Sequence, residues 1–203
     1  RRPRGGFVEN IYVERVRANV KRQALYCDML GSARWVGELA QRYPAREITP
    51  LTPWFANISI HDVEITGCST LVDVSALPEK PVKNFFFGNV KAHCDRIDKI
   101  CDATKFSMKD VRIESCDTVM RIDNCDYASF FGFSNVTTGS SVKIEKTGGE
   151  CRYLNVQTYP LVPVNYQSIR PGEVWLDTEG KPIHAHGFQV TFREGKYYWY
   201  GED

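Results

Sequence analysis

Apolar and polar positions alternate through a short phrase that returns along most of the chain. In each copy, two apolar residues stand two positions apart and are soon followed by a polar residue and a valine. Apolar residues at this spacing lie on one face of an extended strand. A strand that returns every 20 to 27 residues, after one early gap of 47, predicts a solenoid whose turns cover one another. The copies are Ile11–Val16, Ile58–Val63, Phe85–Val90, Phe106–Val111, Phe131–Val136 and a degenerate Cys151–Val156.

A second short strand follows the phrase in each repeat, separated from it by a polar corner. Two or three such strands in every turn are what a right-handed parallel β-helix needs, with backbone hydrogen bonds between turns about 4.8 Å apart. We therefore predict an all-β fold, with a right-handed parallel β-helix (a solenoid) over residues 1–157 and a short C-terminal β-hairpin segment. The predicted second strands are Ala24–Leu30, Thr70–Val74, Arg96–Ile100, Thr118–Ile122 and Ser141–Ile144.

The segment Gly31–Pro53 interrupts the repeat and accounts for its longest gap. A long insertion in a tight solenoid flanks a binding groove in one interpretation and covers the side of the solenoid in the other. Both interpretations stay open on the sequence alone. A short one-sided helix is predicted within the insertion, because residues at i, i+3, i+4 and i+7 form one apolar face, namely Val36, Leu39, Ala40 and Tyr43.

The chain changes character after residue 157. Residues 158–170 contain two prolines and predict a stiff linker. Residues 171–203 are rich in tryptophan and tyrosine, and the segments Phe188–Phe192 and Lys196–Tyr200 predict a hairpin. A lone hairpin is at best marginally stable, so we interpret this part as the opening of a second domain.

Composition and charge place the chain among ordinary folded proteins. Hydrophobic residues make up 42% and charged residues 25%, which is typical of a soluble globular protein and not of a disordered one. The net charge of +1 gives no overall bias toward nucleic acid, and no apolar run approaches the roughly 18 residues of a membrane span. The first 22 residues carry seven Lys and Arg against two Glu (7 − 2 = +5), which suits either an anionic polymer or a solvated face.

Seven cysteines give an odd count, and none forms a C-x-x-C pair. Cys68 and Cys116 each stand five residues after the valine of the phrase, and Cys94 stands four after it. Equivalent positions in successive turns stack, so we predict a column of buried free thiols, in preference to disulfides or metal ligands. The acidic series that starts at Asp95 matches no calcium-binding loop, so neither a metal site nor a cofactor is predicted.

The run Arg4–Ile11 (RGGFVENI) is followed by Ala24–Tyr26, Thr52–Pro53 and the phrase that starts at Asn57–Ile58. Together these motifs resemble glycoside hydrolase family 28, the polygalacturonases, over residues 1–157. The resemblance implies a right-handed parallel β-helix and corresponds to the C-terminal third of such an enzyme. Family members are inverting hydrolases that use aspartates in N-x-D, D-D and G-H-G motifs, followed by R-x-K. This set of motifs is expected upstream of Arg1, so the isolated chain is expected to lack the acid and base and to be inactive.

The same resemblance implies two substrate-binding residues. Tyr26 matches the position where the family presents an aromatic ring to the sugar, and such a ring offers a flat apolar face and a hydroxyl. Arg4 lies next to the family's cations for the substrate carboxylate, and a guanidinium pairs well with a uronate. The structural alternatives are that Tyr26 is a packed strand residue and that Arg4 is an exposed loop residue.

A second resemblance covers the end of the chain. The segments that carry it are Pro171–Glu173, Trp175–Asp177, Gly180, Pro182–Ile183, Ala185–Gly187 and Gly195–Glu202. They resemble glycoside hydrolase family 43, whose members are five-bladed β-propellers, and this implies a partial first blade in residues 171–203. His186 and Glu202 are then candidates for lining a sugar site. The alternative for His186 is a structural histidine with satisfied hydrogen bonds.

We therefore expect a fragment of a glycoside hydrolase that acts on pectic or related plant polysaccharide, located outside the cell or in the periplasm. An anionic pectic glycan is the expected partner, whereas nucleic acid and a membrane span are not expected. The chain does not begin with Met, so the true N-terminus and any export signal are expected upstream. The alternatives are a non-catalytic glycan-binding or structural β-helix and a tail-spike-like interaction protein. An open first turn exposes a sheet edge, so association through that edge is also predicted.

Overall fold

The structure is a computed structural model of the 203-residue chain, and it describes residues 4–158, 175–177, 182–183, 186–193 and 195–202. The chain divides into two compact units, Arg1–Thr158 and Tyr159–Asp203. Apart from Thr158, the predicted linker lies outside the described residues. Within the described residues, no helix has the length and apolar character needed to cross a bilayer.

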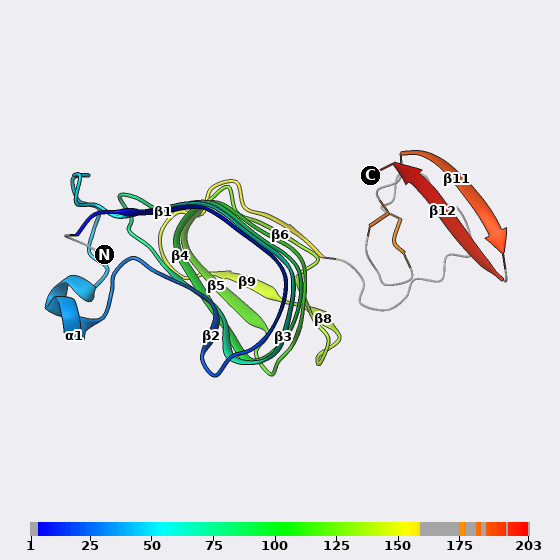
Figure 1. The fold of residues 1–203 in the computed structure, drawn as a ribbon, viewed down its shortest axis with the longest axis horizontal. Helices are drawn as coiled ribbons and strands as arrows, with labels where there is room; N and C mark the ends of the chain where they lie inside the picture. Colours follow the sequence, from blue (N-terminus) through cyan, green and yellow to red (C-terminus); the bar gives the residue numbers. More distant parts are fainter. Residues whose placement is uncertain (1–3, 159–174, 178–181, 184–185, 194, 203) are drawn as a thin grey trace. The chain divides into compact units, whose positions relative to one another are not determined.

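The first unit is built of strands that pair mainly in parallel (Figure 1). The exception among the described strands is the antiparallel contact of the short strands β7 and β8. The class is therefore all-β with long parallel strands, as predicted. The long strands are β1 (Phe7–Asn19), β2 (Gln23–Asp28), β3 (Trp54–Ser75), β4 (Val82–Glu114) and β5 (Val119–Asp126). The short ones are β6 (Ser129–Phe131), β7 (Ser134–Asn135), β8 (Ser140–Ser141), β9 (Lys143–Lys146) and β10 (Asn155–Gln157).

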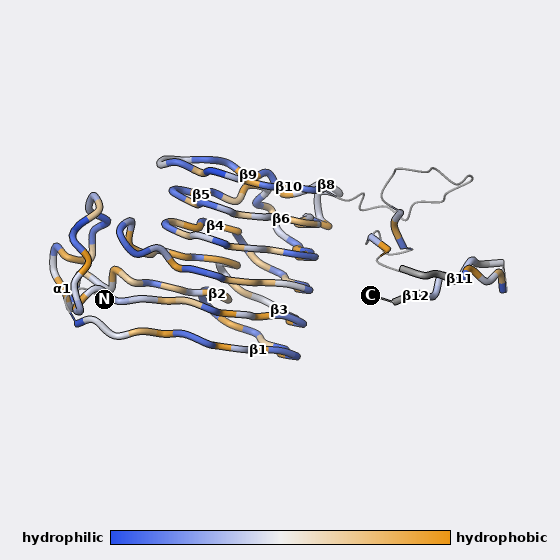
Figure 2. The backbone as a smooth tube through the Cα atoms, turned by 90° about the horizontal axis from the view of Figure 1, so that it is seen from above, coloured by the Kyte–Doolittle hydropathy of each residue, from blue (hydrophilic) through white to orange (hydrophobic). Residues whose placement is uncertain are grey.

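The first three copies of the phrase lie side by side in the register that the sequence predicts. Ile58 of β3 pairs with Ile11 of β1 on one side and with Phe85 of β4 on the other. Figure 2 shows the paired segments lying one above another, with β1 at one edge and β9 and β10 at the other. The apolar residues of each segment therefore continue the core of the segment beneath it.

The core of the first unit consists of such columns of buried side chains. Phe85 and Phe106 are 3% and 1% exposed, and their rings stack with centroids 5.1 Å apart and an interplanar angle of 18°. A second column is formed by residues that are Cα partners in β2 to β5, namely Cys27, Val74, Ile100 and Ile122, all of which are buried. Burial of these side chains removes apolar surface from water at every level of the stack, which is the main source of stability in such an arrangement.

The last two copies of the phrase are out of register with the first four, so this part of the sequence prediction is wrong. Met108 pairs with Phe130, and Phe130 pairs with Val156. The counterpart of Phe106–Val111 is therefore Ala128–Phe133 and not Phe131–Val136. The fifth residue of each true copy has a positive φ, which sets a corner at that point. Those residues are Arg15 (54°), Asp62 (55°), Asn89 (46°), Asp110 (54°) and Gly132 (64°).

Two further expectations need correction. Helix α1 covers Ala33–Val36 and a 3₁₀ helix covers Gly37–Ala40, so the helical part of the insertion begins earlier than predicted and ends before Tyr43. Gly37 has φ 57° and ends α1, because a left-handed residue cannot continue the helix.

The predicted thiol column is also shorter, as Cys68 and Cys94 are buried Cα partners but Cys116 is exposed. Ser115 is the buried residue beside Cys116, and its hydroxyl donates to the carbonyl of Asp95 over 3.2 Å.

Asparagines form a ladder at a second corner, directly before the phrase. Asn57 donates to Asn10 over 3.1 Å, and Asn84 donates to Asn57 over 2.9 Å. All three have a positive φ, between 54° and 59°, which asparagine tolerates better than most residues. The same corner continues through Lys105, Tyr127 and Tyr153, each with a positive φ, and the rings of Tyr127 and Tyr153 stack 4.6 Å apart.

Replacing Asn57 with alanine is expected to lower the free energy of unfolding by about 1–2 kcal/mol, because the change removes two hydrogen bonds and places alanine in a left-handed conformation. Asn57→Gly loses the same hydrogen bonds but adopts a positive φ freely, so it should cost about 1 kcal/mol less than alanine. Urea unfolding followed by circular dichroism measures both. Equal losses in the two variants would contradict the role assigned to the backbone corner.

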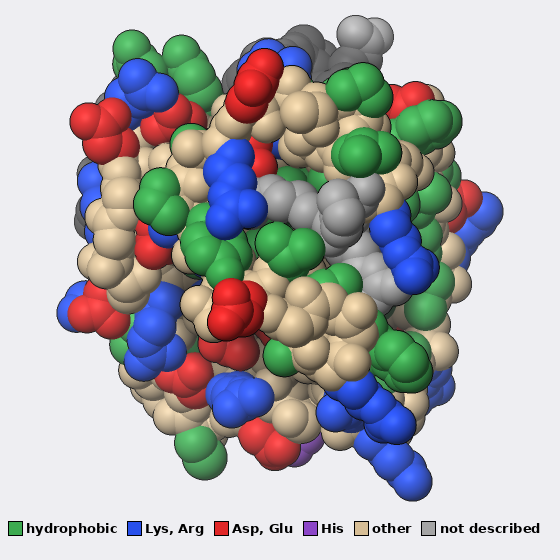
Figure 3. All heavy atoms as spheres, turned by 90° about the vertical axis from the view of Figure 1, so that its left-hand side faces the viewer, with side chains coloured by type: hydrophobic (Ala, Val, Ile, Leu, Met, Phe, Trp, Pro, Cys, Tyr) green, Lys and Arg blue, Asp and Glu red, His purple; other side chains and the backbone are tan. Residues whose placement is uncertain are grey.

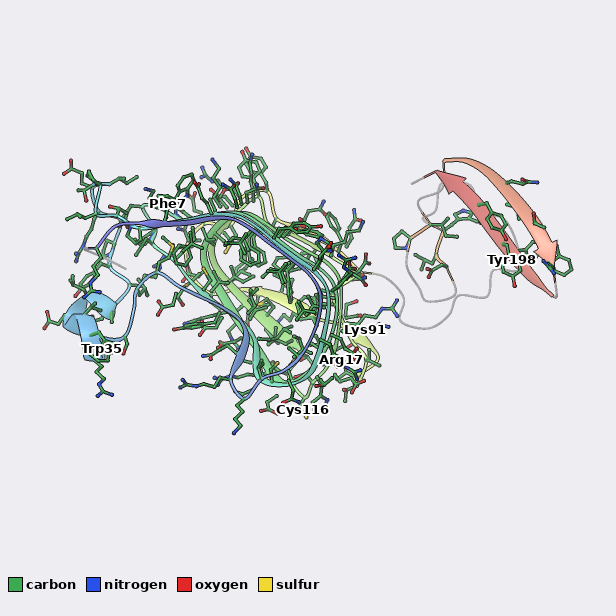
Figure 4. The ribbon with its side chains drawn as sticks, viewed as in Figure 1. Phe7, Arg17, Trp35, Lys91, Cys116 and Tyr198 are labelled. Carbon is green, nitrogen blue, oxygen red and sulfur yellow. The ribbon has the colours of Figure 1, made fainter. Side chains whose placement is uncertain are left out.

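The described part of the second unit contains an antiparallel hairpin of β11 (His186–Arg193) and β12 (Lys196–Glu202). Its strands are longer than the predicted hairpin segments at the outer ends. Trp175 and Trp199 contact each other edge to face, with ring centroids 5.1 Å apart. Several exposed aromatic side chains line the hairpin, among them Tyr198, which is labelled in Figure 4.

Candidate functional site

Tyr26 is an exposed residue of β2 whose hydroxyl is held in place. Its side chain is 58% exposed, and the phenol donates to Oδ2 of Asp28 over 2.9 Å. The other oxygen of Asp28 accepts the backbone N–H groups of Leu30 and Gly31, at 2.8 and 3.0 Å. Asp28 therefore fixes both the tyrosine hydroxyl and the backbone at the start of the insertion. The interpretation of Tyr26 as a packed strand residue is wrong, since more than half of its side chain is exposed.

The electrostatics around Tyr26 keep its phenol protonated at neutral pH. Partial burial and the hydrogen bond to Asp28 raise the pKa of Tyr26 to about 12. Asp73 is the Cα partner of Tyr26 in β3, and burial raises the pKa of its carboxyl, with Lys99 opposing that shift. Lys99 is in turn the Cα partner of Asp73 in β4. We call Tyr26, Asp28, Asp73 and Lys99 the Tyr26 surface.

The insertion is anchored to the stacked strands by a buried ion pair. Nε and Nη2 of Arg42 donate to the two carboxylate oxygens of Asp102, at 2.7 and 2.8 Å. The Asp102 side chain is completely buried, whereas that of Arg42 is 36% exposed. Asn124 donates to the same carboxylate over 2.6 Å, and the Asp102 hydrogen bond holds the pKa of Arg42 above its ordinary value. The insertion is therefore fixed on the unit by a specific tether.

Arg4 is an exposed residue at the entrance to β1. The residue after it, Gly5, donates its N–H to the carbonyl of Leu51 over 2.9 Å and so joins the N-terminal run to the end of the insertion. Gly5 has φ 65°, and a β-carbon there would lie 2.6 Å from the carbonyl oxygen of Pro50. The R-G-G motif therefore has a structural function at Gly5. Among the described residues, no hydrogen bond, ion pair or ring contact joins Arg4 to Tyr26.

The face of the molecule that carries the insertion has no single sign of charge. Figure 3 shows basic and acidic side chains interspersed across this face, with apolar side chains between them. A surface of this kind offers many hydrogen-bonding groups without a strong net field. It is compatible with a ligand rich in hydroxyl groups.

His186 and Glu202 are Cα partners at the outer end of the β11–β12 hairpin. The structure thus brings the two predicted residues to the same place in the second unit. Only their backbones are described. Their proposed contact with sugar stays a prediction.

A cluster that the sequence interpretation missed lies on the outward face of β1 and β3. Nε2 of His61 lies 2.8 Å from the Tyr12 hydroxyl, and Nδ1 lies 2.9 Å from Oδ2 of Asp62. Tyr12 donates to Glu14 over 3.0 Å, which raises the pKa of the phenol. Hydrogen bonds from Asn89 and His61 lower the pKa of Asp62. The sequence contained a signal for this cluster. Stacking the first two copies of the phrase pairs Glu14 with His61 and places Tyr12 beside them on the outward face.

The triplet Asn124–Cys125–Asp126 has N-x-D spacing, but its polar groups are already engaged. Asn124 donates to Asp102, and Asp126 is bound by the guanidinium of Arg152. The Arg152 hydrogen bonds also lower the pKa of Asp126. A carboxylate paired in this way is poorly suited to general acid catalysis, because it holds no proton near neutral pH.

Comparisons with models of known protein families, with curated proteins and with solved structures found no match to this chain. Within the described residues, no group of three or more His, Cys, Asp or Glu side chains is placed to hold a metal ion. The resemblances to the two glycoside hydrolase families therefore stay predictions that rest on the quoted motifs.

The Tyr26 surface combines the groups that bind a sugar. The tyrosine ring offers an apolar face, and carboxylates accept hydrogen bonds from hydroxyl groups. Lys99 is exposed and offers an ammonium group to a carboxylate. Both oxygens of Asp28 already accept hydrogen bonds, so this residue positions Tyr26 and is a poor general base. The arrangement favours binding over acid–base chemistry.

Proposed function

We propose that the chain is part of a polygalacturonase-like glycoside hydrolase that acts outside the cell or in the periplasm on pectic polysaccharide. In this proposal, residues 1–157 form a right-handed parallel β-helix, and residues 171–203 begin a propeller-like domain. The β-helix is supported by the long parallel strands and by the register of the first phrase copies. The propeller-like domain is supported by the β11–β12 hairpin alone.

The observation that carries the proposal is the exposed, fixed ring of Tyr26. An exposed aromatic side chain normally keeps rotational freedom, which is lost when a ligand binds. Here the hydroxyl is held by a hydrogen bond to Asp28 within the same strand. The ring is therefore arranged in advance as a platform for a pyranose, at the position that the family resemblance assigns to the substrate. The chain supplies binding, and the acid and base are expected elsewhere in the parent enzyme.

Isothermal titration with trigalacturonic acid tests this proposal. Tyr26→Ala is expected to weaken binding about tenfold, because stacking and the hydroxyl contact together contribute on the order of 1.4 kcal/mol. Tyr26→Phe keeps the ring and should lose less. Arg4→Ala tests the second predicted contact in the same way.

Tyr153→Ala is a matched control, because Tyr153 is a 70% exposed tyrosine at a corner far along the stack from β2. Its replacement should leave the dissociation constant unchanged. If Tyr26→Ala binds trigalacturonic acid as tightly as the unmodified chain does, the assignment of this surface is wrong.

A second candidate function is a non-catalytic glycan-binding or structural β-helix. The Tyr26 surface fits this function equally well, because both oxygens of Asp28 accept hydrogen bonds and the surface then offers binding groups only. The two functions differ in the parent protein. Release of reducing sugar from polygalacturonate by the parent supports the hydrolase, whereas binding without release supports the second candidate.

A further inference from the structure

A groove lies at the corner that follows the phrase in β3 and β4. It is lined by equivalent three-residue segments of neighbouring strand segments, Glu64–Thr66, Lys91–His93 and Arg112–Glu114, together with Val136. Its volume is about 590 Å³. The middle residue of each segment is buried, and its two neighbours point outward. We call this hollow the corner groove.

The corner groove runs along the stacking direction. Lys91 of β4 is the Cα partner of Glu64 of β3, which is the partner of Arg17 of β1. Neighbouring strands are about 4.8 Å apart, so three segments give the groove a length of roughly 10–15 Å. That length fits two or three sugar units. Figure 4 shows Arg17 and Lys91 on the side of the stacked strands opposite to the insertion, which carries Trp35.

The charges in the groove are arranged so that Lys91 is available. Arg17 pairs with Glu64 over 3.4 Å, and His93 lies 3.4 Å from Glu114. Lys91 is exposed and has no ion pair within 4.0 Å among the residues that the structure describes. Arg112 adds a second basic residue to the lining. Among the described residues, the groove therefore presents the Lys91 ammonium group near Arg112, with Glu64 paired to Arg17 and Glu114 close to His93.

We propose that the corner groove is a second binding site for a carboxylate-bearing oligosaccharide, separate from the Tyr26 surface. This inference rests on the proposed function for its ligand class, and on the corner groove for its location. The Lys91 ammonium group binds the uronate carboxylate, because a charge-assisted hydrogen bond is about twice as strong as a neutral one. Glu114 accepts hydrogen bonds from sugar hydroxyls, and the apolar side chain of Val136 contacts the ring.

A second site apart from the Tyr26 surface would strengthen the binding of a polymer. Two weak sites on one molecule bind the same long chain with a higher apparent affinity than either site alone. The Tyr26 surface and the corner groove therefore hold a polymer such as polygalacturonate more tightly than they hold a trimer. Binding to the groove is also expected to weaken as salt rises, since its main contact is between exposed charges.

Two-dimensional amide NMR of the full chain with trigalacturonic acid tests the inference. Amide shifts are expected in the three groove segments, with a dissociation constant of their own. Lys91→Gln should weaken that constant about tenfold, because it removes a charged hydrogen bond. Lys91→Arg should retain most of the affinity. Lys83→Gln is the matched control, since it removes the same charge from another exposed position of β4.

The outcomes separate this inference from the proposed function. Shifts confined to the Tyr26 surface overturn the groove and leave the proposed function intact. Shifts at the groove alone support the groove and count against the Tyr26 platform. Absence of shifts in all three groove segments overturns the inference whatever happens at Tyr26. A polyglutamate peptide that binds the groove as tightly as the trimer overturns the saccharide assignment.

Discussion

Replacing Arg42 with alanine is expected to lower the free energy of unfolding by about 3–5 kcal/mol, because it leaves a buried carboxylate without its partner. The Asp102 side chain is completely buried, and Arg42 supplies two of its hydrogen bonds. Among the described contacts of the Asp102 carboxylate, this change leaves only the hydrogen bond from Asn124. Urea unfolding measures the loss.

A second variant shows whether the uncompensated charge causes the loss. Adding Asp102→Asn to Arg42→Ala removes the buried charge while keeping a side chain that tolerates the positive φ of 61° at this position. The double variant should therefore be more stable than Arg42→Ala alone. Arg46→Ala is the control, because Arg46 is an exposed residue of the same insertion whose guanidinium stacks on the ring of Tyr43. A double variant no more stable than Arg42→Ala would contradict the buried-charge explanation.

Phe106→Ala is expected to cost about 3–5 kcal/mol, because it removes a large buried ring and leaves a cavity. Phe106 is 1% exposed and stacks on Phe85 in the neighbouring segment. Phe106→Leu fills more of the space and should cost less. Thermal and urea unfolding of both variants measure the difference.

Phe7→Ala is the control for the core substitution. Phe7 is 71% exposed at the edge strand β1, so its replacement should change the free energy of unfolding by less than about 0.5 kcal/mol. If Phe7→Ala and Phe106→Ala have equal effects, the columns of inward side chains do not carry the stability of the first unit.

The sequence predicts the strands and their parallel stacking because the inward positions repeat at a period of two. It fails on the register of the last two copies, where Phe131–Val136 fits the pattern better than the true counterpart Ala128–Phe133. The structure instead follows the corner residues with positive φ, and Gly132 fills that position in the true copy. Aligning the repeats by their corner residues as well as by their apolar residues therefore predicts the strand register better than aligning them by apolar residues alone.

The candidate site is predictable only where it is local in sequence. Tyr26 and Asp28 are two residues apart on one strand, so their shared face follows from the strand period. The Arg42–Asp102 tether joins residues 60 positions apart and has no local signal. The corner groove could be found from the sequence only after the register of three separate segments is known. Long-range side-chain pairs of this kind are set by tertiary structure and not by pattern.

We expect the Tyr26 surface to bind pectic polysaccharide. Amide NMR with trigalacturonic acid tests it directly, because the shifts report which residues the ligand touches. We expect shifts at Tyr26, Asp28 and Asp73 that saturate together, and in Tyr26→Ala the shifts at Asp28 and Asp73 should need about tenfold more ligand to saturate. Amides on β2 and β3 that stay unmoved at millimolar ligand would contradict it.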